Sequence, residues 1–164
     1  MKIGVVSDTH GNLRTTRLAV ERLAAHDVEA VLHCGDIVSS EVIPYFAEWP
    51  THFVFGNCDH NAAELRATIQ DAGQFCHEQF GELELGGRRI GLLHGHDSAR
   101  FRECVESDEY DLVCYGHTHV ADSRQSGRTL VLNPGALHRA IPHTFAVVDL
   151  ADMSVDWITL PRDS

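Results

Sequence analysis

Short apolar runs rich in β-branched residues alternate with helix-like segments through the first half of the chain. Each run is followed closely by a polar residue next to a glycine, and apolar side chains at helical spacing come after the first two runs. The strands predicted here lie at residues 3–7, 30–33 and 52–55, with helices around residues 20–24 and 42–46. This alternation predicts the α/β class, with parallel strands and helices packed against the sheet.

Strands dominate from residue 74 onward. Residues 82–85 and 88–93 form a predicted hairpin around Gly86-Gly87, and a helix is expected at residues 99–106. Further strands are predicted at residues 112–115, 129–132, 144–149 and 155–159. We therefore expect two packed sheets flanked by helices, in one domain over residues 1–164, since domains commonly hold roughly 100 to 200 residues.

The composition is that of an ordinary globular protein, with 43% hydrophobic and 23% charged residues. The sequence contains no apolar stretch near the roughly 20 residues that a membrane span needs, and its first residues do not resemble a signal peptide. We expect a cytoplasmic protein without membrane contact. The five cysteines form no CxxC pair, which argues for reduced thiols rather than disulfides or a structural zinc site.

The formal net charge of -11 argues against binding to duplex nucleic acid, because affinity for the phosphate backbone depends on clustered lysine and arginine. The chain has 13 basic and 24 acidic residues. A small phosphorylated molecule is a better match as the binding partner.

Potential metal ligands follow successive predicted strands. They are Asp8, His10, Asp36, Asn57, His94, His117 and His119. Because ligands of α/β proteins bind beyond the carboxyl ends of the strands, loops that are distant in sequence can converge there. The two residues in Asp8-x-His10 and in His117-x-His119 are two positions apart, so in extended backbone both side chains face the same way. Carboxylate, imidazole and amide ligands without thiolates suit Mn, Fe, Co, Ni or Zn.

These fragments together resemble the calcineurin-like metallophosphoesterase superfamily, and in particular its small YfcE-like phosphodiesterase branch. The fragments that carry the resemblance are Asp8-Thr9-His10, Gly35-Asp36, Gly56-Asn57-Cys58-Asp59, Leu93-His94-Gly95-His96, Gly116-His117-Thr118-His119 and Leu132-Asn133-Pro134-Gly135. Taken singly, each could be a turn, a helix cap or a solvated polar residue. Their common order, each after a predicted strand, favours the functional interpretation.

The resemblance implies a four-layer αββα sandwich of two mixed β-sheets flanked by helices. It also implies two divalent metal ions, with manganese expected first and Ni, Co, Fe or Zn as alternatives. Asp8, His10 and His119 would hold one ion, Asn57, His94 and His117 the other, and Asp36 would bridge them. A hydroxide between the ions would then attack a small phosphodiester in line.

The residues assigned catalytic roles on this basis are Asn57, His94 and Asp59. Asn57 and the ring of His94 or His96 would help to neutralise charge on the phosphoryl oxygens. The resemblance departs from the superfamily pattern at Cys58, where many members have a histidine that helps to protonate the leaving group. We further expect that His138 or Arg139, just after the Asn133-Pro134-Gly135 turn, could contact the substrate.

Two other functions fit the same pattern. One is a protein-binding scaffold of the same fold, like the retromer subunit, and the other is a nucleotide sensor that binds without turnover. The complete set of seven ligand residues favours catalysis, because a scaffold has no physical need for it. Relatives of this kind commonly self-associate, so a homodimer or homotetramer is a further expectation.

Overall fold

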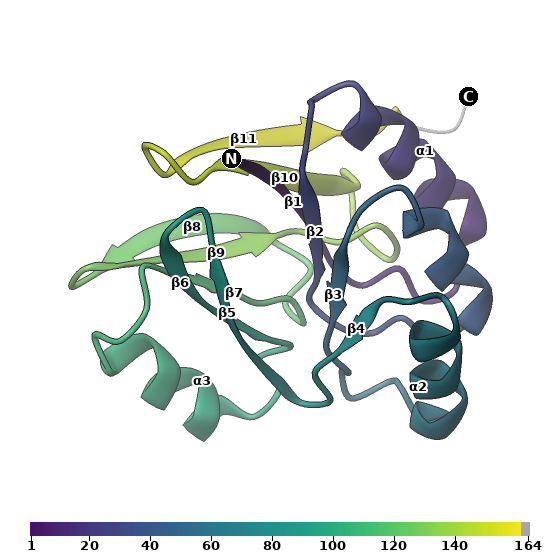
Figure 1. The fold of residues 1–164 in the computed structure, drawn as a ribbon, viewed down its shortest axis with the longest axis horizontal. Coiled ribbons are helices and arrows are strands. Elements are labelled where there is room, and N and C mark those ends of the chain that lie inside the picture. The colour runs from purple at the N-terminus through teal and green to yellow at the C-terminus, as the bar shows by residue number, and fades with distance from the viewer. Residues whose placement is uncertain (162–164) are drawn as a thin grey trace.

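The computed structural model describes residues 1–161 and shows two β-sheets packed face to face between layers of helices (Figure 1). The first sheet has the strand order β11-β10-β1-β2-β3-β4, and the second has the order β5-β6-β7-β9-β8. Both sheets contain parallel and antiparallel pairs. The predicted four-layer αββα arrangement is therefore confirmed.

The strands of the first sheet are β1 (Lys2–Val6), β2 (Ala30–His33), β3 (Thr51–Phe53), β4 (Phe75–Cys76), β10 (Thr144–Asp149) and β11 (Ser154–Thr159). Those of the second are β5 (Phe80–Leu85), β6 (Arg88–Leu93), β7 (Leu112–Cys114), β8 (Ala121–Ser126) and β9 (Thr129–Pro134). The helices are α1 (Leu13–Ala24), the 3-10 helix η1 (Ser40–Phe46), α2 (Ala62–Asp71) and α3 (Ser98–Glu106). No helix in the described residues is long and apolar enough to cross a membrane.

Strand direction places several loops at the same end of the molecule. Strands β1 to β4 run parallel in the first sheet, and β6, β7 and β9 run parallel in the second. Their carboxyl ends are therefore on one edge of each sheet, where the connecting loops begin.

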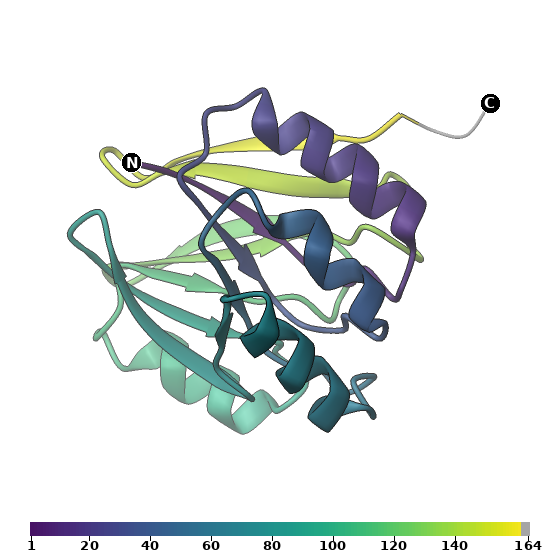
Figure 2. The ribbon, with the colours of Figure 1, turned by 45° about the vertical axis from the view of Figure 1, so that its right-hand side comes forward.

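Burial of apolar side chains holds the four layers together. Ile3, Leu32, Leu92 and Leu132 are among the fully buried residues between the two sheets. A second core lies between the first sheet and α1, η1 and α2, and a third lies between the second sheet and α3. Figure 2 shows α1, η1 and α2 on one outer side and α3 on the opposite side.

Side-chain caps fix where two helices begin. Asn12 accepts a hydrogen bond from the backbone N–H of Thr15 at the start of α1, and Asp97 accepts bonds from Ala99 and Arg100 at the start of α3. These bonds satisfy backbone donors that have no partner within the helix. The caps matter for function because both helices begin directly after loops that carry predicted ligands.

Three elements were not predicted: α2, β4 and β8. Helix α2 buries only Leu65 and Ile69 and has no side-chain cap bond, so its apolar signal is short. Strand β8 is polar and exposed or half-buried along its whole length, and β4 has two residues. The strand predicted at residues 52–55 is observed at Thr51–Phe53, and the buried residues Val54 and Phe55 continue it as a loop.

His52 on β3 gives the fold a measurable pH dependence. Its ring stacks on Phe75, its Nδ1 lies 2.9 Å from His77 Nε2, and burial lowers its pKa to about 4. Because the folded pKa lies below the unfolded value of 6.5, protonation favours the unfolded chain. The stability contributed by neutral His52 is complete above about pH 6.5 and is lost as the pH falls toward 4.

We predict that His52→Gln removes this pH dependence. Between pH 7 and pH 4, the unfolding free energy of the metal-free wild type should fall by about 2 kcal/mol more than that of the variant. Urea denaturation followed by circular dichroism in EDTA measures both. Parallel stability curves for the two proteins would contradict the assignment.

Candidate metal centre

The seven predicted ligand residues lie in loops at the carboxyl ends of five strands. They are Asp8 and His10 after β1, Asp36 after β2, Asn57 after β3, His94 after β6, and His117 and His119 after β7. The first three strands belong to one sheet and the last two to the other. The loops of both sheets meet at this end of the molecule, and they bring the donors together.

The first donor group contains Asp8, His10 and His119. Asp8 Oδ1 lies 3.2 Å from His119 Nε2 and 3.7 Å from His10 Nε2, and the two ring nitrogens are 3.4 Å apart. Two ligands that are each about 2.1 Å from one cation in a tetrahedral site lie about 3.4 Å apart. The three atoms therefore have the spacing of ligands around one ion.

The second donor group contains Asn57, His94 and His117. His94 Nε2 lies 3.1 Å from Asn57 Oδ1, and the rings of His94 and His117 have centroids 5.2 Å apart. Asp36 lies between the groups, because its Oδ2 is 3.4 Å from His94 Nε2 and 3.6 Å from His10 Nε2. A carboxylate in this position can contact two adjacent cations.

Several atoms of the site that can accept a hydrogen bond or bind a cation lie close to one another. Asp8 Oδ1 is buried and has no hydrogen-bond partner in the described part of the chain. Cys34 O accepts from His94 Nδ1 at 2.7 Å, which leaves the lone pair of Nε2 facing oxygens of Asn57 and Asp36. Unpaired buried acceptors are unfavourable in isolation, so this donor set fits divalent cations.

The charge states lead to the same conclusion. Burial opposes ionisation of Asp36, but the ring of His94 and the backbone N–H of Cys58 outweigh it and hold the Asp36 pKa below its usual range. Burial also opposes protonation of His94, yet Asp36 raises the His94 pKa above its ordinary value. The loops therefore favour positive charge beside Asp36.

The backbone is strained at five of the seven positions. The φ angles are 54° at Asp8, 44° at His10, 55° at Asp36, 69° at His117 and 60° at His119. This left-handed region is uncommon for residues other than glycine, and each instance costs about 1 kcal/mol or more. Such conformations persist where the surrounding contacts hold them, and they cluster at functional sites.

Two motif glycines make room for the carboxylates. A Cβ at Gly56 would lie 2.1 Å from Asp36 Oδ1, and a Cβ at Gly116 would lie 2.0 Å from Ser7 Oγ and 2.7 Å from Asp8 Oδ2. Neither space admits a methyl group without moving the acid. The glycines next to Asn57 and His117 are thus explained by close packing of the loops.

Ser7 and Asn133 support the site and were not predicted. Ser7 Oγ donates to Asp8 Oδ2 at 2.6 Å, and Asn133 Nδ2 donates to Gly116 O at 2.9 Å and to Thr118 Oγ1 at 3.0 Å. These bonds fix the orientation of one carboxylate and of the loop that carries both C-terminal histidines. The signal for Asn133 is the Asn133-Pro134-Gly135 motif, and Asn133 lies near the carboxyl end of β9, a parallel neighbour of β7.

Asp59 lies behind the cluster. Its Oδ1 accepts from the N–H of Val38 at 2.7 Å, and its Oδ2 accepts from the N–H of Gly56 at 2.8 Å. Both oxygens therefore tie together the loops that follow β2 and β3. These contacts describe a positioning residue, and a direct catalytic role for Asp59 stays a prediction.

Cys58 lies at the margin of the cluster. Its sulfur is within 4.8 Å of donor atoms of His10 and Asp36. Burial and the Asp36 carboxylate raise the pKa of the thiol, so it is protonated at neutral pH. His60 is exposed in the same loop, and the ring of His96 lies 5.5 Å from that of His94.

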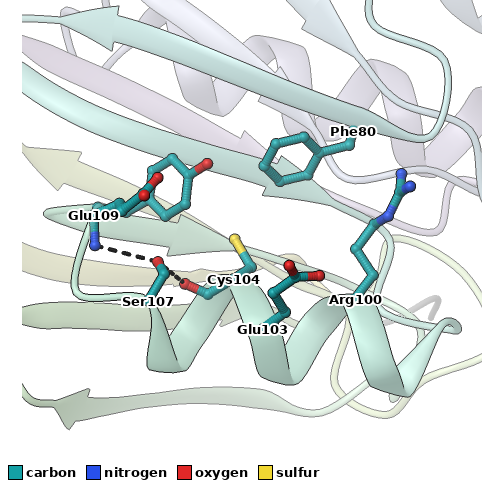
Figure 3. A pocket seen from close by; sticks show the side chains of 7 residues that line it. Phe80, Arg100, Glu103, Cys104, Ser107 and Glu109 are labelled. Carbon is teal, nitrogen blue, oxygen red and sulfur yellow. Dashed lines mark hydrogen bonds between the residues drawn. The ribbon is translucent and has the colours of Figure 1, made fainter.

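A separate cavity of about 320 Å³ lies beside α3. Figure 3 shows Phe80 and Arg100 toward one end, Glu109 toward the other, and Cys104 and Glu103 between them. None of the seven donors lines it. Its lining has two glutamates against the single arginine Arg100, and the metal ligands predicted for the substrate are elsewhere, so this cavity is not the expected place for the substrate.

The sequence of this chain is similar to those of known phosphoesterases. A family model described as the calcineurin-like phosphoesterase superfamily domain matches residues 1–153. Phosphodiesterase MJ0936 of Methanocaldococcus jannaschii is 35% identical over 138 residues, which cover 82% of this chain and 83% of that protein. Phosphodiesterase YfcE of Escherichia coli is 24% identical over 153 residues, covering 84% and 79% respectively.

A solved structure gives the same result for the fold. It is described as a novel archaeal phosphodiesterase, is 31% identical, and superposes with a TM-score of 0.91 over 98% of this chain and 100% of that one. The resemblance inferred from the motifs is therefore confirmed.

We predict that Gly56→Ala weakens metal binding. The added methyl group must displace the Asp36 carboxylate, so the affinity for Mn²⁺ measured by calorimetry should fall at least about 10-fold. Gly87→Ala is the control: a Cβ at Gly87 meets no atom within 4 Å, and any strain from its φ of 74° arises before β6, at the end of the strand away from His94. Equal Mn²⁺ affinity in wild type and Gly56→Ala would contradict the proposed crowding of Asp36.

Proposed function

Since this chain belongs to the calcineurin-like phosphoesterase superfamily, we propose that its metal-dependent hydrolysis of phosphate esters is directed at small phosphodiesters. The observation that carries the proposal is the position of Asp36, whose carboxylate oxygen lies within 3.6 Å of a ring nitrogen from each donor group. Relatives named phosphodiesterase support a diester as substrate.

We assign the donors to two divalent ions. Asp8, His10 and His119 would hold one, Asn57, His94 and His117 the other, and Asp36 would contact both. When bound, such ions lower the pKa of water toward neutrality and neutralise charge on a phosphoryl group. Manganese is the ion we expect first, with nickel, cobalt, iron and zinc as alternatives that the mixed donors also suit.

The protein residues at the mouth of the site would position the phosphoryl group. The amide of Asn57 is exposed there, and its Oδ1 is oriented toward His94. The exposed His96 ring lies 6.3 Å from the ring of His117, on the same side as His94. Asn57 and His96 can therefore donate hydrogen bonds to phosphoryl oxygens as negative charge develops on them.

Hydrolysis at this site requires no nucleophile from the protein. Cys58 is the nearest candidate, and its protonated thiol is a weak nucleophile at neutral pH. We therefore propose direct attack by water-derived hydroxide, without a phosphoenzyme.

Asp36→Asn is expected to abolish hydrolysis of bis(p-nitrophenyl) phosphate in Mn²⁺. Loss of the shared negative charge should lower kcat/KM by more than about 100-fold, because changes outside the ligand set already cost 10- to 100-fold. EDTA should abolish wild-type activity, and added Mn²⁺ should restore it.

The exposed Asp71→Asn, at the end of α2, is the matched control and should retain wild-type activity. Thermal melting shows whether each variant is folded. A folded wild type that binds metal but hydrolyses neither monoesters nor diesters would instead support the sensor or scaffold function.

We predict that kcat/KM depends steeply on the leaving group. The raised pKa of the Cys58 thiol makes it a weaker acid than a protonated histidine, and so a poorer proton donor. Wild-type kcat/KM should be about 100-fold higher for p-nitrophenyl than for phenyl diesters, within the range attributed to general acid catalysis. Cys58→His should narrow this ratio, and Cys58→Ser should leave it unchanged. If the ratio of kcat/KM for the two diesters were the same in the wild type and Cys58→His, the lack of a proton donor at Cys58 would not explain the dependence on the leaving group.

A further inference from the structure

A cavity of about 460 Å³ lies between the start of α1 and the loop of residues 138–143. Its lining includes Arg14, His138, Arg139 and His143. Among residues 1–161, no aspartate or glutamate lines it. We call it the cationic pocket. The positive charge of Arg139 beside a lining without a described carboxylate stands out in a chain with 13 basic and 24 acidic residues, and it marks a place suited to an anion.

The cationic pocket adjoins the first donor group. The rings of His138 and His10 have centroids 6.2 Å apart, and Arg139 O accepts from His119 Nδ1 at 3.2 Å. Asn12 Nδ2 donates to His138 Nδ1 at 3.0 Å, which ties the loop to the start of α1. A ligand can therefore contact the pocket and the metal centre at the same time.

The backbone of Arg139 is held in a defined conformation. Its φ of 56° is left-handed, and its carbonyl is fixed by His119. Arg139 lines the cationic pocket, so its guanidinium can pair with a phosphate there.

We propose that the cationic pocket binds a second phosphate group of the substrate while the scissile phosphate lies at the metal centre. This inference rests on the proposed function and specifies its substrate class: a phosphodiester whose organic part carries another phosphate. Ile141, which is 83% exposed at the rim, offers apolar surface to the part of the substrate that joins the two phosphates.

The test uses two chromogenic substrates that differ by one phosphate: the p-nitrophenyl ester of thymidine 5′-phosphate, with and without a 3′-phosphate. The wild type should hydrolyse the 3′-phosphorylated compound with a kcat/KM about 10- to 100-fold higher, as expected for charge-assisted hydrogen bonds. Arg139→Gln should remove most of this preference. Arg17→Gln, on the exposed surface of α1 and paired with Glu21, is the matched control and should keep it.

A binding measurement separates this inference from the proposed function. In the Mn²⁺-loaded wild type, thymidine 3′,5′-bisphosphate should bind at least about 10-fold more tightly than thymidine 5′-phosphate, and Arg139→Gln should equalise the two. Equal affinities in the wild type, or a preference that survives in a folded Arg139→Gln, would overturn the pocket assignment. Loss of turnover with both substrates, while the binding preference persists, would overturn the proposed function alone.

Discussion

Two buried carboxylates set the conditions for the rest of the structure. Asp8 and Asp36 lie among the ring nitrogens of His10, His94 and His119, and few hydrogen bonds compensate their burial. Positive charge between the donors would stabilise such an arrangement. The left-handed backbone at the ligand positions allows the carboxylates and imidazoles to come close together. The neighbouring glycines, which have no Cβ, leave room for them. The ends of the packed strands hold these loops in place, so that their side chains stay close together.

Much of this arrangement is readable from the sequence, because the same residues mark both the ends of strands and the chemistry. Gly35-Asp36 and Gly56-Asn57 end apolar runs whose burial is unambiguous, so the fold class and the convergence of the loops could be predicted together. Helix α2 was missed because Leu65 and Ile69 alone give too short a pattern. Ser7 could not be predicted, because serine is common at the ends of strands and the sequence does not show that its hydroxyl donates to Asp8. That the seven residues act as ligands remains a prediction, although their side chains lie close together.

Charge is distributed unevenly around the site. The cavity beside α3 contains two glutamates, whereas the cationic pocket beside His138 and Arg139 contains arginine and histidine side chains. Because the chain as a whole is acidic, the proposed pocket would give an anion a preferred side from which to approach the proposed metal centre. Under the two proposals, cleavage of the phosphate ester and the choice of substrate would depend on different loops, which His119 connects through the carbonyl of Arg139.

The donors come from loops of both sheets, with Asp8 on one side and His119 on the other. A cation held between them would act as a cross-link between the two halves of the sandwich, in addition to the apolar contacts of Leu32 and Leu92. Binding energy for the ion would then appear as resistance to unfolding, in proportion to the logarithm of its free concentration. The free energy of unfolding of the sandwich would thus depend on the concentration of divalent ions that these loops bind.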